Sequence, residues 1–66
     1  GGTLTELNLK FYKRMPYEVI DEWFEDFIPP IGAFVEINGH RYKIHNIVIE
    51  QKRSKDKPRV VHIEIL

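Results

Sequence analysis

The chain has 66 residues, a mass of 7.9 kDa and a formal net charge of zero, with 10 basic and 10 acidic side chains. This length allows one domain over 1–66, and the hydrophobic share of 42 % excludes a disordered chain. Because cysteine is absent, disulfides and thiolate chemistry are excluded as well. Without an export signal or an apolar run near ~18 residues, the predicted location is the cytoplasm, no membrane partner is expected, and Gly1-Gly2 is interpreted as a tag remnant.

The N-terminal half is predicted to hold a strand followed by a helix. Residues alternate between apolar and polar from Thr3 to Tyr12, which is typical of a half-buried strand. Pro16 suits the first position of a helix. Four apolar side chains then recur at i, i+3, i+4 and i+7: Ile20, Trp23, Phe24 and Phe27. This spacing predicts a helix over 16–28 with one apolar stripe, ended by the two prolines that follow.

The C-terminal half is predicted to hold three strands, at 33–37, from His40 onward and at 59–66. Asn38-Gly39, between the first two, is a strong signal for a two-residue hairpin. A change of apolar phase at His45-Asn46 predicts a β-bulge, and a polar loop is predicted over 51–58. The last strand carries no proline or inward charge, so it is expected to be a poorly guarded sheet edge.

These elements follow one another in the order strand, helix, strand, strand, strand. The predicted fold class is therefore α+β, with one helix packed on a small, bent antiparallel sheet or barrel, because a helix with one apolar stripe must cover a sheet. A domain of this size has marginal stability. With disulfides excluded and no metal expected, self-association is the remaining means of stabilisation.

The middle of the chain resembles a known family. Its residues 29–48 read PPIGAFVEINGHRYKIHNIV, which is similar to the string Pro-x-x-Gly-x-x-Val-x-Ile-x-Gly-x-x-Tyr-x-Val-x-x-Val of short SH3-like β-barrel proteins, many of them encoded by phages and other mobile elements. The stretch Val60-Val61-His62-Ile63 is similar to their last strand. The resemblance implies an SH3-like barrel of phage type, and it brings no catalytic or ligand-binding residue with it.

Catalytic and metal-binding patterns are absent from the sequence. The only serine, Ser54, lies in a charged loop without an adjacent base, so the protein is predicted not to be an enzyme. His40, His45 and His62 lack the ligand spacing that zinc requires, and neither a metal nor a cofactor is predicted.

Charge is unevenly distributed along the chain. Residues 1–37 carry 3 basic and 7 acidic side chains, whereas residues 38–66 carry 7 basic and 3 acidic ones. Five acidic residues fall in the predicted helix: Glu18, Asp21, Glu22, Glu25 and Asp26. They are interpreted either as a solvated helix face or as the binding surface for a basic partner protein.

The basic side chains allow two interpretations. They lie in the predicted hairpin and in the polar loop: Arg41, Lys43, Lys52, Arg53, Lys55, Lys57 and Arg59. One interpretation is a solubilising loop. The alternative is a phosphate-binding surface for nucleic acid or a small signalling nucleotide.

The sequence also contains more apolar side chains than one small core requires. Five of them are predicted to form a self-association surface if their strands are neighbours: Phe34, Ile47, Ile49, Val60 and Leu66. A barrel that closes over both faces would bury them instead. The leading hypothesis is a small non-enzymatic binding protein that self-associates and acts on another protein, as a phage-type accessory or inhibitory protein.

Overall fold

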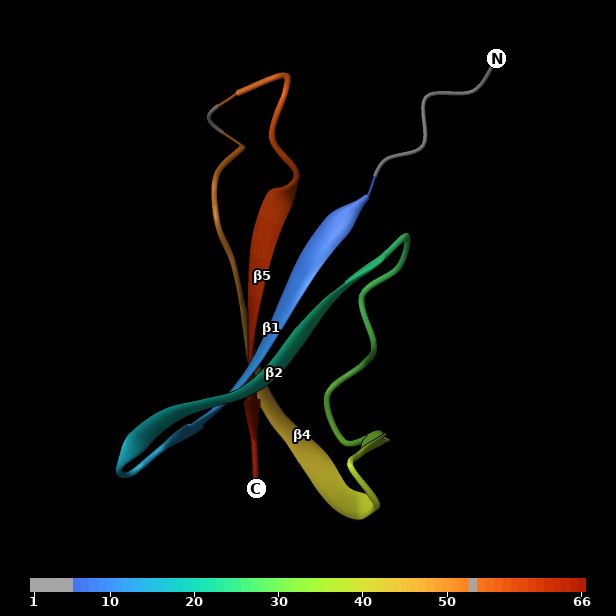
Figure 1. Ribbon diagram of the computed structural model, residues 1–66, viewed down its shortest axis with the longest axis vertical. Coiled ribbons are helices and arrows are strands. Elements are labelled where there is room, and N and C mark those ends of the chain that lie inside the picture. The colour runs from blue at the N-terminus through green and yellow to red at the C-terminus, as the bar shows by residue number, and fades with distance from the viewer. Residues whose placement is uncertain (1–5, 53) are drawn as a thin grey trace.

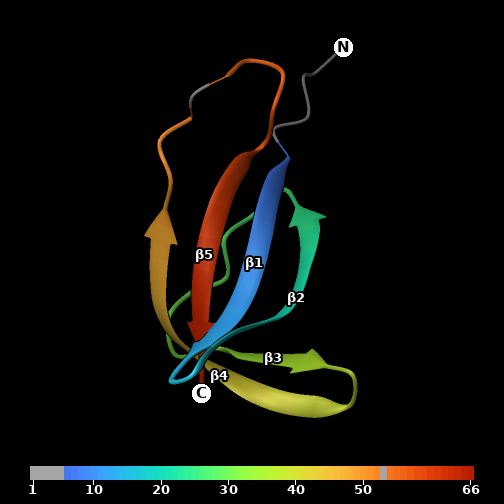
Figure 2. The same cartoon turned by 60° about the vertical axis from the view of Figure 1, so that its left-hand side comes forward.

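The computed structural model describes residues 6–52 and 54–66. The interpreted tag remnant, the start of the predicted first strand and Arg53 lie outside these ranges. Five strands are present in the described chain: β1 (Leu7–Arg14), β2 (Tyr17–Glu25), β3 (Phe34–Ile37), β4 (His40–Ile49) and β5 (Arg59–Ile65). They form one sheet in the order β2-β1-β5-β4-β3, which curls into a half-barrel (Figure 1, Figure 2).

The predicted helix over 16–28 is wrong, because most of these residues form strand β2. The described chain is all-β, so the α+β class and the helix packed on the sheet are incorrect. The coarser expectation of a small β-barrel is consistent with the observed half-barrel. A two-residue turn, Met15-Pro16 with a cis peptide bond, folds β2 back onto β1 so that Arg14 pairs with Tyr17. Pro16 therefore belongs to a hairpin turn and does not begin a helix.

A β-bulge explains why β2 has the apolar spacing of a helix. Phe11 lies opposite Asp21 and Tyr12 opposite Val19, so Ile20 is the extra residue of the bulge. In a regular strand, residues three apart point to opposite faces. The bulge removes this alternation, and Ile20 and Trp23 both pack against the core.

The predicted turn, bulge and strand positions of the C-terminal half are confirmed. Ile37 pairs with His40 across the Asn38-Gly39 turn, where both turn residues have the positive φ angles, 52° and 83°, that this hairpin requires. In β4, Ile44 pairs with Ile65 and Asn46 with Glu64, which leaves His45 as a bulged residue. The strand positions also agree with the prediction.

Strand β5 is the centre of the sheet, which corrects its predicted role as an unguarded edge. It pairs in parallel with β1 and antiparallel with β4, so the sheet is mixed and not antiparallel. The free edges are β2 and β3. Without a proline or inward charge, β5 is suited to an interior position because both of its sides are hydrogen-bonded.

The core lies on one face of the curled sheet. Its fully buried members are Leu9, Phe11, Ile37, Ile44, Val61, Ile63 and Ile65. Phe11 stacks on Trp23 with ring centroids 4.4 Å apart, which attaches the edge strand β2 to this core. Phe24 and Phe27 were predicted to face the core but are 54 % and 53 % exposed. Phe24 alternates with the inward-facing Trp23 in β2, and Phe27 lies beyond the end of this strand.

Removing one methyl group at two isoleucines tests this packing. Ile63 is fully buried and Ile49 is 49 % exposed. We expect Ile63→Val to lower the free energy of unfolding by about 0.5–1.5 kcal/mol, and Ile49→Val to lower it by less. Urea denaturation followed by circular dichroism measures both variants. Equal losses would contradict the arrangement of β4 and β5.

Candidate functional site

The acidic residues predicted to bind a partner lie on or next to an edge strand. Four of them belong to β2 and Asp26 follows it. Asp21 and Glu25 are half-buried on the core side, where Trp23 Nε1 donates a 3.3 Å hydrogen bond to Glu25 Oε2. Glu18 and Glu22 are exposed. The structure thus divides the carboxylates of β2 between different environments, and the predicted acidic helix face does not exist.

The position of these carboxylates on a sheet edge predicts a structural role for them. One side of β2 is hydrogen-bonded to β1 and the other side is a free edge. Charged side chains on a free edge oppose pairing with the same edge of a second molecule, since like charges would face each other. The same charges attract a basic segment of another protein.

The basic residues predicted to bind phosphate are separated into two groups. Arg41 and Lys43 lie in the β3–β4 hairpin, where the Arg41 guanidinium is 5.9 Å from the centre of the Phe34 ring. The loop between β4 and β5 lies at the opposite end of the molecule (Figure 1, Figure 2). The molecule is 37 Å long, so the two groups do not form one surface.

The loop itself contains a small pocket of about 170 Å³. Its lining includes Lys52, Ser54, Lys57 and Arg59, whereas Lys55 is exposed outside it and Arg53 lies beyond the described residues. The ends of the loop are held together by a hydrogen bond of 3.0 Å from the Glu50 amide to the Val60 carbonyl.

The histidines do not come together. His62 Nε2 lies 2.6 Å from Glu50 Oε2, close to the end of the loop. His40 lies beside Tyr42 at a ring distance of 6.4 Å, and His45 is the bulged residue of β4. Across residues 6–52 and 54–66, no group of three or more potential metal ligands is formed.

The five apolar residues predicted to mediate self-association are placed on different parts of the sheet. Ile47 and Ile49 lie opposite the buried Ile63 and Val61, on the core side of the sheet. Val60 alternates with Val61 and therefore points to the other face. Phe34 and Leu66 are exposed, at 64 % and 65 %, in β3 and after β5. The structure does not bring these five side chains together.

A different exposed apolar group lies in the stretch 24–34, which joins the two edge strands. Its members are all exposed: Phe24, Phe27, Ile28, Ile31 and Phe34. We call this group the open-side residues, because the stretch runs along the side of the half-barrel between β2 and β3 (Figure 2). Sequence reasoning missed it because Phe24 and Phe27 were assigned to a buried helix stripe. The high density of apolar residues in 24–34 is the sequence signal from which this group could have been predicted.

A pocket of about 700 Å³ lies where β1 and β5 separate. Their pairing ends at Tyr12 and Glu64. Beyond this point β1 continues with β2, and β5 continues with β4, so the two central strands diverge like a fork. The pocket, which we call the fork pocket, is lined by Lys13, Arg14, Met15, Glu64, Ile65 and Leu66.

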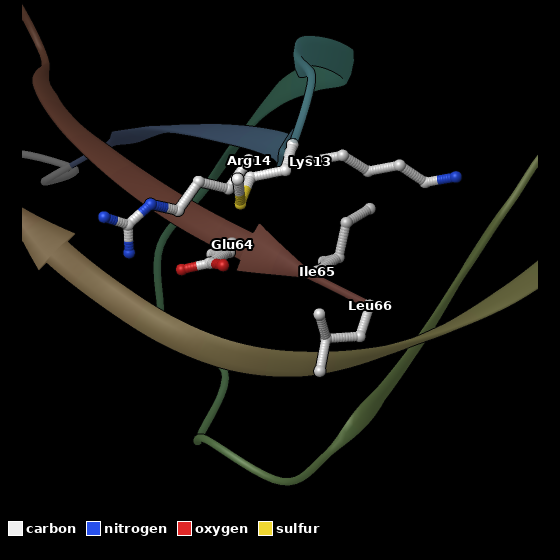
Figure 3. Close-up of a pocket in the computed structure, with 6 residues that line it drawn as sticks. Lys13, Arg14, Glu64, Ile65 and Leu66 are labelled. Atoms are coloured by element: carbon white, nitrogen blue, oxygen red, sulfur yellow. The ribbon is translucent and has the colours of Figure 1, made fainter.

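Glu64 is the buried charged residue among those that line the fork pocket, at 7 % exposure (Figure 3). Strand alternation places it on the face opposite Ile63 and Ile65, which predicts exposure. Its cross-strand neighbours on that face are Tyr12 of β1 and Asn46 of β4, one on each side. Sequence reasoning could not have found this site, since it depends on the parallel pairing of strands 52 positions apart, such as Leu7 with Arg59.

Comparisons with family models, with curated proteins and with solved structures find no match to this chain. Among the residues described, no helix is long and apolar enough to cross a membrane.

Replacing acidic residues on the free edge of β2 tests their structural role. We expect Glu18→Thr combined with Glu22→Thr to increase self-association, because an uncharged edge pairs more readily with its copy. The matched control is Glu6→Thr combined with Asp56→Thr, which removes two exposed carboxylates outside the strands. Static light scattering at equal concentration compares the pairs. Identical scattering from both variants would show that the β2 carboxylates do not guard the edge.

Proposed function

We propose that the protein is a cytoplasmic, non-enzymatic binding protein that self-associates through the open-side residues. The observation that supports this is the concentration of exposed apolar side chains in the stretch that joins the two free edges. Isolated exposed apolar residues are ordinary, but five within 24–34 form a concentration of the kind that marks an interface.

The size of the molecule agrees with this proposal. A standard interface buries about 800 Å² on each partner, which is about a sixth of the 5145 Å² surface of the chain. Fully burying one large apolar side chain contributes about 1.5–3 kcal/mol of stability. Burying a few of the open-side residues at an interface would therefore add substantially to the stability of a small domain. A core of seven buried apolar side chains is small, so apolar burial at an interface would increase the stability of the domain.

The acidic side chains of β2 favour association through apolar side chains over direct pairing of two β2 edges. Direct pairing of two β2 edges would bring the exposed Glu18 and Glu22 of both copies close together, which is unfavourable. Packing through apolar side chains avoids this repulsion. For a partner other than a second copy, the acidic edge selects a basic surface. The accessory or inhibitory role of phage type belongs to this proposal, because it agrees with the resemblance of 29–48 and with the lack of catalytic patterns in the sequence.

Two polar substitutions in the open side test the self-association. We expect the wild type to give multiples of 7.9 kDa in native mass spectrometry and light scattering, and Phe27→Ser combined with Ile31→Ser to give the monomer. Met15→Ser combined with Val48→Ser is the control, because these two residues are also exposed but lie elsewhere. A monomeric wild type, or equal dissociation of both variants, would contradict the proposal.

A second candidate function is supported by the pocket in the β4–β5 loop. Lys52, Lys57 and Arg59 line it together with the half-buried Ser54, and a volume of about 170 Å³ suits a small anionic group. Glu50 also lines the pocket, so three cationic side chains stand against one carboxylate, which is 2.6 Å from His62 Nε2. Such a site would hold a phosphate of nucleic acid or of a small nucleotide. Arg41 and Lys43 are not part of this second proposal, since they lie at the other end of the molecule.

A matched pair of charge reversals tests the loop. We expect Lys57→Glu to weaken the binding of a fluorescein-labelled single-stranded oligonucleotide, and Lys43→Glu to leave it unchanged. Fluorescence anisotropy at several salt concentrations is the measurement, and affinity should fall linearly on a log–log plot as counterions compete. Binding that is independent of salt, or equally sensitive to both reversals, would exclude a phosphate site in the loop.

A further inference from the structure

The fork pocket contains a carboxylate that lacks a partner. Glu64 is 93 % buried, and within the described part of the chain no hydrogen bond or ion pair reaches its side chain. No buried side-chain oxygen or nitrogen there is both enclosed and unpaired, so the Glu64 oxygens remain accessible from the pocket. An ionised carboxylate only accepts hydrogen bonds, and a desolvated one without a donor is unfavourable. The pocket therefore presents two acceptor oxygens to a ligand with N–H donors.

The rim of the pocket restricts the charge of that ligand. Arg14 extends from the end of β1 on the side of Glu64, whereas Lys13 extends in the opposite direction, with its Nζ 5.3 Å from the centre of the Tyr42 ring (Figure 3). The cationic Arg14 side chain at the entrance disfavours a cationic ligand and favours an anionic group. The donors that Glu64 accepts from must then belong to a neutral part of the ligand, while its anionic part faces Arg14.

The remaining walls are apolar. Met15 is 91 % exposed and Leu66 is 65 % exposed, so both have free surface for contact with a flat apolar body. The volume of about 700 Å³ lies within the range of about 300–1,000 Å³ that is typical of small-molecule sites. The ligand should therefore combine a planar body, two adjacent neutral N–H donors and an anionic group.

We propose that the fork pocket binds a guanine nucleotide. The N1–H and the N2 amino group of guanine are adjacent donors, and they match the two oxygens of one carboxylate. The phosphate then faces Arg14. Adenine presents one donor beside an acceptor nitrogen on the same edge, which a carboxylate repels. This site is distinct from the loop pocket and from the open-side residues, and it does not rest on the proposed function.

Nucleotide titrations of the protein test the proposal. Amide chemical shifts are followed by NMR while GMP, AMP or inorganic phosphate is added. We expect GMP to shift the amides of Arg14, Glu64 and Leu66, and AMP to bind about 5- to 150-fold more weakly, the discrimination of one good bidentate contact. Equal affinity for GMP and AMP, or the same shifts with phosphate alone, would overturn the proposal.

Substitution of Glu64 gives a test that loss of folding cannot imitate. Glu64→Gln replaces two acceptors by one acceptor and one donor, which match the N6 donor and N1 acceptor of adenine. We expect this variant to lose its preference for GMP and to bind AMP more tightly than the wild type does. Unchanged preference would show that Glu64 does not contact the base.

Substitution at the rim tests the phosphate contact. Arg14→Gln should weaken the binding of GMP and leave the binding of guanosine, which lacks the phosphate, unchanged. Lys55→Gln is the control of equal charge change in the distant loop, and it should leave GMP binding unchanged. Equal effects of the two substitutions would show that the rim is not a specific phosphate contact.

Discussion

The parallel pairing of β1 with β5 is the interaction on which the rest of the structure depends. It brings Leu9 beside Val61 and Phe11 beside Ile63, which are four of the seven buried apolar residues. Each of the two strands then serves as the inner strand of an antiparallel pair, β1 with β2 and β5 with β4. Without this pairing the chain would consist of the β1–β2 hairpin and the three-stranded sheet of β3, β4 and β5, with no common core, and an isolated two-stranded hairpin is at best marginally stable in water.

The same pairing determines where the chemistry of the surface lies. Because β1 and β5 occupy the centre, the edges are β2 and β3, and the apolar stretch between them remains uncovered. Because the pairing ends at Tyr12 and Glu64, the two strands diverge and leave the fork pocket between them. The interface and the ligand site that we propose are therefore two consequences of one arrangement, on different sides of the sheet.

Local signals in the sequence predicted the C-terminal half well. The Asn38-Gly39 turn and the bulge at His45 depend on residues that are neighbours along the chain, so turn chemistry and apolar phase were sufficient. The prediction for β2 was wrong because a bulge at Ile20 gives a strand the apolar spacing of a helix. Glu64 and the fork pocket could not be predicted, because no local pattern specifies which distant strand lies beside β5.

The two paired central strands are far apart in the sequence, and this affects how the chain folds during synthesis. Every residue of β1 that pairs with β5 has its partner 52 positions later, as Leu7 with Arg59. During synthesis, β1 and β2 therefore precede the strand that completes their core. Contacts of such long sequence separation slow folding. Until β5 pairs with β1, the apolar face of the β1–β2 hairpin has no cover, and uncovered apolar surface of this kind favours aggregation.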